Sequence, residues 1–244
     1  MTLGFLGPAH SFSERAALAL ANGRALVPFP DIAALFAALA HGQVDGIVVP
    51  LENSEVGAVP ATLAELVALP APLAVLGDLD LPIRFALYRR VDDEAPLTRV
   101  VAHAMSLAQC APWIAARRVG QRAVGSNGTA FAQVRNGSAA GEGALAPLGI
   151  KDAGMIAVEQ NLQGARAFET RFLLLAPDAE AGSLHCALVS ISGLSELDHW
   201  PGNARVLTPA NNDPPPAVYE LTPTAPTAPD RLPGRPLLLW RASA

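Results

Sequence analysis

The chain has 244 residues, of which 51% are hydrophobic and 16% charged, and its formal net charge is −5. This composition favours a packed core over wholesale disorder, and the length suits one bilobed unit or a larger domain with a small one. An acidic chain without a basic stripe argues against a nucleic-acid partner.

No apolar segment reaches the length of a membrane span, and no basic stretch precedes an apolar run near Met1. We therefore expect a cytoplasmic protein with no membrane association. Cys110 and Cys186 lie far apart and form no metal-binding spacing, so we expect two free thiols and no metal.

The first 176 residues alternate short apolar runs with stretches of helical periodicity. These predict strands at 2–6, 46–50, 99–102, 123–125, 143–146 and 171–175, with an extended stretch around 78–82. They also predict helices from Ser11 to about Ala21 and at 32–41, 59–69, 106–117, 128–134 and 148–153. Strands separated by helices indicate a mostly parallel sheet, in which ligands bind at the carboxyl ends of the strands.

Residues 177–244 differ in composition, because they hold most of the proline. Short apolar runs at 184–191, 205–207, 217–221 and 236–240 are separated by turn-forming residues. We predict a small strand-rich appendage or a partly ordered tail, with its boundary near 178–182.

Small hydroxyl, amide and guanidinium groups stand at the turns that follow the predicted strands. They fall in the segments 4–14, 49–59, 103–110, 125–130 and 168–175. Free amides at a helix N-terminus favour an anion, so this chemistry suits an anionic small molecule bound without a cofactor. Each segment also has an ordinary interpretation, namely a helix cap, a polar loop or, for Arg171, a structural ion pair.

The order and spacing of these segments resemble the prephenate dehydratase family. Its domain carries a Gly-Pro strand turn followed by Phe-Ser-Glu, then Val-Pro-Ile-Glu-Asn-Ser, a His block ending in Leu-Ala-Gln-Cys, Ser-Thr-Ala and Thr-Arg-Phe. The matches here are Gly7-Pro8 with Ser11-Phe12-Ser13-Glu14, Val49-Pro50-Leu51-Glu52-Asn53-Ser54, His103 with Leu107-Ala108-Gln109-Cys110, Gly128-Thr129-Ala130 and Thr170-Arg171-Phe172. The resemblance covers about residues 2–176.

The chain departs from the family pattern at several positions. Glu55 has moved by one position, Phe168 stands where asparagine is usual, and Ala104 stands where proline follows the histidine. The tail lacks the Glu-Ser-Arg-Pro motif of the family's ACT domain, and 193–197 only faintly echoes that domain's first effector motif. Residues 179–244 are therefore predicted to be a degenerate ACT-like or irregular strand-rich appendage.

The resemblance implies an α/β fold with two lobes, like a type II periplasmic binding protein. The catalytic domain would span 1–178, with lobe one at about 1–79 plus 166–178 and lobe two at about 80–165. The implied reaction removes carbon dioxide and water from prephenate to give phenylpyruvate in L-phenylalanine biosynthesis, and it needs no cofactor. The family commonly forms dimers or tetramers, so a homodimer or homotetramer is expected.

The resemblance also implies roles for individual residues. Thr170 would hydrogen-bond or protonate the departing ring hydroxyl, and Arg171 would bind a substrate carboxylate. The polar lining would come from Ser11, Asn53, Ser54, Gln109 and Thr129. Phe172 would pack beside the ring or in the core, and Glu52 would orient its loop or pair with Arg171.

Two other functions are compatible with the departures. One is a prephenate decarboxylase of specialised metabolism that does not aromatise the ring, and the other is a non-catalytic small-anion-binding protein on the same fold. The retained Glu-Asn-Ser and Thr-Arg-Phe blocks favour the dehydratase. Whether the substrate is prephenate or arogenate stays open.

Overall fold

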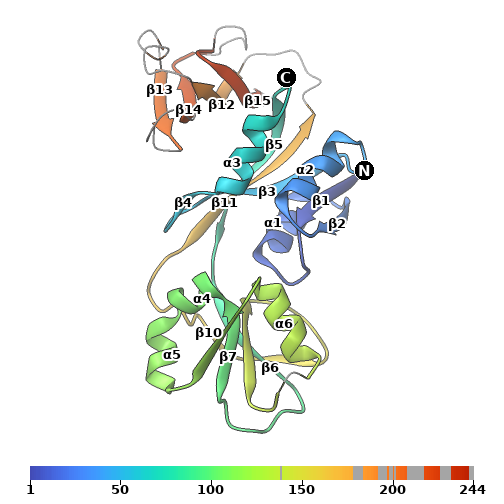
Figure 1. The fold of residues 1–244 in the computed structure, drawn as a ribbon, viewed down its shortest axis with the longest axis vertical. Coiled ribbons are helices and arrows are strands. Elements are labelled where there is room, and N and C mark those ends of the chain that lie inside the picture. Colours follow the sequence, from blue (N-terminus) through green and yellow to red (C-terminus); the bar gives the residue numbers. More distant parts are fainter. Residues whose placement is uncertain are drawn as a thin grey trace.

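A computed structural model describes residues 1–137, 139–177, 184–191, 197, 200, 202–207, 217–225 and 232–241. It has two β-sheets with helices packed on them, in two lobes stacked along the long axis (Figure 1). The predicted two-lobed α/β fold is confirmed. Among the helices of the described residues, none is long and apolar enough to cross a membrane.

Lobe one is built on the larger sheet. Its strands are β1 (Thr2–Leu6), β2 (Ala25–Phe29), β3 (Gly46–Asn53), β4 (Gly57–Ala58), β5 (Leu73–Pro82) and β11 (Glu169–Pro177). Its helices are α1 (Phe12–Leu20), α2 (Ile32–Ala40) and α3 (Pro60–Ala68). The strand order β5-β11-β3-β1-β2 places β11 and β3 at the centre.

Side chains that alternate along β11 and β3 face two separate hydrophobic layers. Phe172 and Leu174 pack with α1, whereas Leu173 and Leu175 pack with α2 and α3. Helix α1 begins where the sequence predicts, because the Ser11 hydroxyl accepts a hydrogen bond from the Glu14 N–H at its start.

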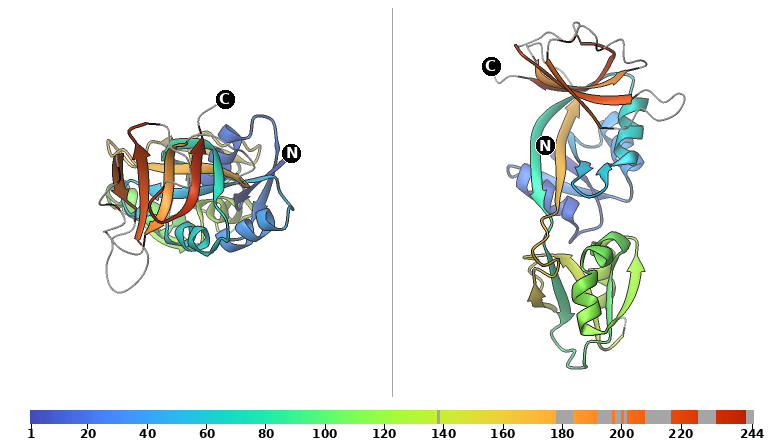
Figure 2. Two further views of the ribbon diagram at one scale, coloured as in Figure 1. Left: turned by 90° about the horizontal axis from the view of Figure 1, so that it is seen from above. Right: turned by 90° about the vertical axis from the view of Figure 1, so that its left-hand side faces the viewer.

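The C-terminal strands extend this same sheet. They are β12 (Leu184–Ile191), β13 (Gly202–Val206), β14 (Ala217–Pro223) and β15 (Arg235–Arg241). β15 runs parallel to β5, with Leu238 beside Leu73. The tail therefore shares the sheet and core of lobe one (Figure 2). The predicted boundary near 178–182 and the echo at 193–196 lie outside the described residues, so the division into domains stays a prediction.

Lobe two holds the smaller sheet, in the order β10-β6-β9-β7-β8. Its strands are β6 (Phe85–Arg90), β7 (Arg99–His103), β8 (Gly120–Val124), β9 (Glu142–Pro147) and β10 (Met155–Gln160), and its helices are α4 (Ala104–Gln109), α5 (Ala111–Arg117) and α6 (Asn127–Arg135). The chain passes between the lobes after β5 and returns before β11, and the Ile83 N–H donates to the Phe168 carbonyl at 2.7 Å where these passages meet.

Four predictions of local structure are wrong or incomplete. Both sheets are mixed rather than mostly parallel, because β11 runs antiparallel between β3 and β5 in the larger sheet and β6 runs antiparallel to β9 and β10 in the smaller one. The helix expected at 106–117 begins at Ala104 with His103 as its cap, and it is interrupted at Cys110. Residues 148–153 form turns rather than a helix. The strands β2, β4, β6 and β10 were not predicted.

Candidate active site

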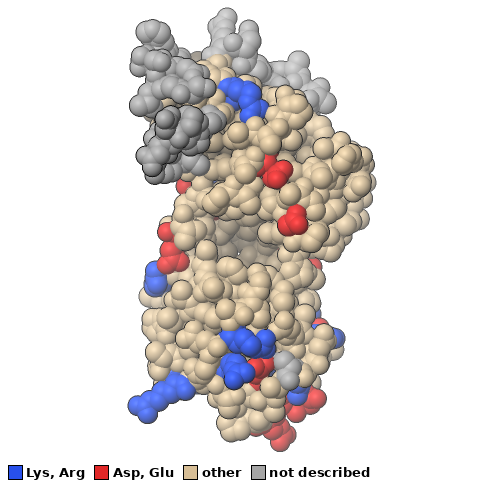
Figure 3. Space-filling model, viewed as in Figure 1, with Lys and Arg blue, Asp and Glu red and all other residues tan. Residues whose placement is uncertain are grey.

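A cavity of about 200 Å³ lies between the lobes. It is formed at the carboxyl ends of β1, β3, β7 and β8 and at the N-terminal ends of α1, α4 and α6. This position is where the sequence analysis expects a ligand. Figure 3 shows the molecule hollowed between its lobes. Among the described residues that line the cavity, none is an arginine or lysine.

Thr170 and Asn53 form the polar centre of the lobe-one wall. The Asn53 amide donates to the Thr170 hydroxyl oxygen at 2.9 Å, and both residues are 8% exposed. The Asn53 carbonyl oxygen accepts from the Glu55 N–H at 3.0 Å, which fixes the orientation of the amide. Because the Thr170 oxygen is an acceptor in this bond, its own O–H is free to donate to a molecule in the cavity.

A β-bulge brings these two side chains to the same face. Thr170 and Asn53 are register partners, and so are Arg171 and Glu52, but Phe172 pairs with Pro50. The extra residue, Leu51, reverses the alternation of β3 from that point onward. Without this extra residue, Asn53 would point to the same side of the sheet as Leu51, and Thr170 would lack its hydrogen-bond partner.

Two capped helices direct their N-termini at the cavity. The Ser11 hydroxyl caps α1, and the Ser126 hydroxyl caps α6 by accepting from the Thr129 N–H at 3.0 Å. The first N–H groups of a helix have no partner inside the helix, and its N-terminus carries partial positive charge. The cavity therefore offers an anion neutral donors in place of a cationic side chain.

The lobe-two wall contains a second fixed network. The Asn127 side chain accepts from the His103 N–H at 2.9 Å and donates to the Ser106 hydroxyl at 2.8 Å. The His103 ring accepts from the Met105 N–H at 3.3 Å. Since the Ser106 oxygen also accepts, its O–H is another donor free for a ligand.

Contacts across the cavity hold the lobes together. The Gln109 amide donates to Glu55 at 2.8 Å, and Glu55 also pairs with Arg166 at 2.9 Å. The ring centroids of His10 and Phe131 lie 4.6 Å apart. Glu55 therefore joins the loop after β3 to helix α4 of the opposite lobe.

The structure brings together four of the eight predicted site residues. Ser11, Asn53, Gln109 and Thr170 line the cavity. Thr129 lies one turn into α6, where its hydroxyl contacts Ser126 at 2.8 Å. Ser54 is exposed and accepts from the Glu169 N–H, and Phe172 is buried in the core beside α1.

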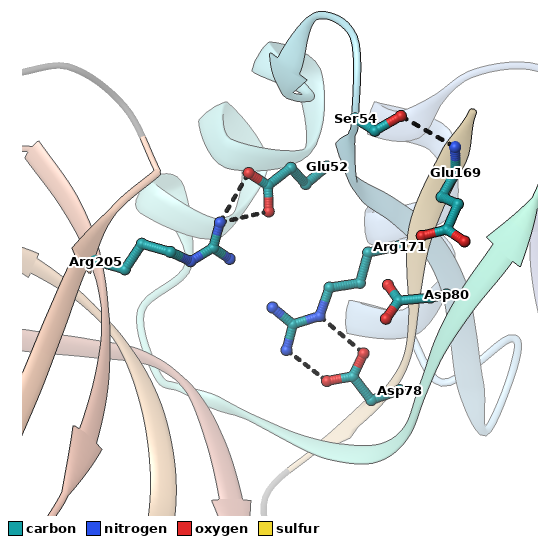
Figure 4. A pocket seen from close by; sticks show the side chains of 7 residues that line it. All are labelled: Glu52, Ser54, Asp78, Asp80, Glu169, Arg171 and Arg205. Atoms are coloured by element: carbon teal, nitrogen blue, oxygen red, sulfur yellow. Dashed lines mark hydrogen bonds and ion pairs between the residues drawn. The ribbon is translucent and has the colours of Figure 1, made fainter. Parts of the chain in front are cut away.

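Arg171 lies on the opposite side of the sheet from Thr170, as neighbours along a strand do. Its guanidinium donates to both oxygens of Asp78, at 2.8 and 2.5 Å (Figure 4). It also donates to Glu220 at 2.7 Å. These bonds raise the pKa of Arg171, against the opposing effect of burial. The expected carboxylate partners thus come from the protein, and Glu52 pairs with Arg205 instead of Arg171.

Five polar lining residues were not among the predicted site residues: Ser13, His103, Ser106, Ser126 and Asn127. All five fall in segments that the sequence analysis singled out, where the polar groups also had an ordinary interpretation as helix caps. Ser126 is indeed a cap, so capping and cavity lining are not exclusive.

The comparison with known families decides the affiliation of the chain. The model of a family described as prephenate dehydratase matches residues 3–180. The chain belongs to the prephenate dehydratase family. A prephenate dehydratase of Amycolatopsis methanolica is 33% identical over 175 residues, which cover 71% of this chain and 57% of that protein. The one of Bacillus subtilis (strain 168) is 29% identical over 185 residues, covering 73% and 65%.

Solved structures share the fold. A prephenate dehydratase from Arthrobacter aurescens in complex with L-Phe has a TM-score of 0.75 at 21% identity, covering 91% of this chain and 79% of that one. GqqA, described as a novel type of quorum quenching acylase, has a TM-score of 0.73 at 17% identity, covering 100% and 98%. The chain spans less than two thirds of the length of the curated family members it matches, for example 57% and 38%.

Proposed function

We propose that the protein is a prephenate dehydratase, which converts prephenate to phenylpyruvate, carbon dioxide and water in L-phenylalanine biosynthesis. The observation that carries this proposal is the Asn53–Thr170 pair, which leaves the threonine O–H as a buried donor facing the cavity. Family membership supports the proposal, because Asn53 and Thr170 belong to the Glu-Asn-Ser and Thr-Arg-Phe blocks.

In the proposed reaction, the C–C bond to the ring carboxylate breaks and its electrons enter the ring. The ring hydroxyl leaves from the opposite carbon and takes up one proton from solvent, so that it departs as water. Thr170 donates a hydrogen bond to this oxygen as negative charge develops on it, and the Asn53 amide polarises Thr170. A threonine is a weak acid at neutral pH, so we assign Thr170 this hydrogen bond rather than the storage of the proton.

The N-termini of α1 and α6 supply the proposed anion-binding groups. Prephenate carries two carboxylates, and the two helix starts, capped by Ser11 and Ser126, lie on opposite lobes around the cavity. Each presents partial positive charge. The first turn of α6 has no acidic residue, whereas Glu14 lies in the first turn of α1 and accepts from the His10 N–H. The ring would then lie between Phe12 and the Asn53–Thr170 pair, in the part of the cavity that apolar side chains line.

The decisive test is incubation of the purified protein with prephenate. Phenylpyruvate is detected as its enolate absorbance in alkali, beside a sample without protein. A non-aromatic keto acid formed with release of carbon dioxide would select the decarboxylase, and binding without turnover would select the small-anion-binding protein. Either result would overturn the proposal.

An acylase is a second candidate, because GqqA matches the chain over its whole length, tail included. Such an enzyme needs an activated nucleophile or water to attack an amide carbonyl. Among the described cavity residues, His103 is the one imidazole, and its ring already accepts from the Met105 N–H. Incubation with an N-acyl amide, followed by measurement of the released amine, separates this candidate from the dehydratase.

A further inference from the structure

The residues next to Asn53 and Thr170 form a second pair on the other face of the sheet. Thr170 is in register with Asn53, and Arg171 is in register with Glu52. Because successive side chains point to opposite faces, Arg171 and Glu52 lie directly behind the cavity pair. Whatever holds this back pair also fixes the backbone that carries Asn53 and Thr170.

The C-terminal strands bind both members of the back pair. From β13, Arg205 donates to the two oxygens of Glu52 at 2.9 and 2.8 Å and to Glu220 of β14 at 3.1 and 2.6 Å. Glu220 accepts in turn from Arg171 at 2.7 Å. The result is an unbroken chain of alternating charges, Glu52–Arg205–Glu220–Arg171, which spans the junction of tail and central strands. Figure 4 shows the Glu52–Arg205 pair of this chain.

The end of this chain of charges formed by Glu220 and Arg171 is largely shielded from water, whereas Arg205 is about half exposed. The side chains of Arg171 and Glu220 are 19% and 12% exposed. Burial alone would raise the pKa of Glu220, but hydrogen bonds from Arg205 and Arg171 hold it below its ordinary value. Glu220 is therefore ionised at neutral pH. Loss of one member of such a network leaves a half-buried charge unpaired, which matters more than loss of a surface pair.

The bulge interrupts the direct ladder between β3 and β11 at this point, although β5 also pairs with β11 here and β4 with β3. Leu51 has no register partner in β11, and the ladder continues beyond it for only the two pairs Arg171–Glu52 and Thr170–Asn53. A short stretch of ladder at the end of a strand frays easily. A misplacement of about 1 Å at a reacting group can reduce a rate about a hundredfold.

We infer that the C-terminal strands are a positioning element of the active site, in which Arg205 and Glu220 hold Glu52 and Arg171 so that Asn53 and Thr170 meet in the cavity. This inference rests on the proposed function for its kinetic consequence. Its structural part, that the tail fixes the ends of β3 and β11, stands independently. In this inference, Arg205 and Glu220 do not contact the ligand. They act by fixing the positions of β3 and β11.

The test compares Arg205→Ala with Arg135→Ala in the full chain. Arg135 is a matched control, because it forms an ion pair with Asp152 in lobe two. The side chains of this pair are 46% and 13% exposed, close to the 48% and 12% of Arg205 and Glu220. We expect Arg205→Ala to lower kcat for prephenate by about tenfold to a hundredfold with KM within about twofold, and Arg135→Ala to change neither. Arg205→Lys, which keeps the charge but loses the fork of donors, should recover part of the loss.

Hydrogen exchange of the same variants gives a readout that needs no substrate. Amides at 46–53 and 169–177 should exchange at least about tenfold faster in Arg205→Ala than in the unmodified protein or Arg135→Ala. Unchanged exchange in these segments would overturn the inference, whether or not prephenate is the substrate. If the unmodified protein turns over prephenate, an unchanged kcat in Arg205→Ala would overturn it as well. An inactive unmodified protein with faster exchange in Arg205→Ala would refute the proposed function alone.

Discussion

Replacement of Thr170 by valine isolates the contribution of one hydroxyl group. Valine has nearly the shape of threonine, so the packing of this 8%-exposed side chain is retained. What is lost is the oxygen that accepts from the Asn53 amide at 2.9 Å and the O–H that faces the cavity. The two losses have separate consequences, one for stability and one for turnover.

The stability consequence follows from the unpaired Asn53 N–H. A buried donor left without a partner costs about 1–3 kcal/mol. The expected catalytic consequence is larger, because one positioned hydrogen-bond donor to developing negative charge contributes about 10²–10³-fold to kcat. Since the proposed hydrogen bond from Thr170 is made to the departing oxygen in the transition state, we expect this loss in kcat with little change in KM.

The assay is steady-state formation of phenylpyruvate, with thermal unfolding measured on the same samples. Thr62→Val is the matched control: Thr62 is fully buried and donates to the Pro50 carbonyl at 2.7 Å, away from the cavity. It should lose a similar amount of stability and keep its kcat. Thr170→Ser, which keeps the hydroxyl, should keep most of the activity. A Thr170→Val variant with the kcat of the unmodified protein would remove Thr170 from the mechanism.

Three further results are expected. A Cβ on Gly128 would lie 2.3 Å from the Ala9 carbonyl oxygen of the opposite lobe. Gly128→Ala should therefore hold the lobes apart and lower kcat/KM for prephenate about tenfold or more. Gly120→Ala is the control, because its Cβ would lie 3.4 Å from its nearest atom, and its kcat/KM should be unchanged in the same assay. Folding lowers the pKa of Glu220, so its ion pairs stabilise the protein above pH ~4.3, and this stabilisation is lost as the pH falls through the lower pKa of the folded state. The melting temperature of Glu220→Gln should therefore fall less steeply with decreasing pH than that of the unmodified protein. An equally steep fall in both proteins would contradict this expectation. Burial raises the pKa of Cys110 to about 12, so mass spectrometry after iodoacetamide treatment at neutral pH should find Cys110 unmodified until the protein is unfolded.

Much of the fold could be predicted from local signals. The caps Ser11 and Asp31 mark the starts of α1 and α2, and the apolar run at 184–191 coincides with β12. These features depend on residues close together in the sequence. The edge strand β2, in contrast, has no buried residue and shows no clear hydrophobic pattern. Its pairing with β1 is set by the sheet and not by its own side chains.

The sequence predicted where the site lies, but only some of the residues that form it. Thr170 and Asn53 were expected in one site, yet the placement of both on one face depends on the bulge at Leu51, which no local pattern signals. For Arg171, the sequence indicates the face of the sheet but not the partners of the side chain. Its position one residue after Thr170 already implies the opposite face of the sheet, but its carboxylate partners Asp78 and Glu220 are distant in sequence.

The placement of the arginines has a consequence for the proposed chemistry. A reaction that expels carbon dioxide must destroy one carboxylate of its substrate, and an ion pair with that carboxylate would be strongest before the reaction and weakest after it. Such a bond would stabilise the bound substrate more than the transition state and would slow the step. Helix N-termini and hydroxyl groups bind the anion more weakly, but they retain their positions as charge moves toward the departing oxygen. With Arg171 held behind the sheet by Asp78 and Glu220, the cavity keeps neutral donors where the carboxylate is lost, and the strong cation serves to hold the strand that carries Thr170.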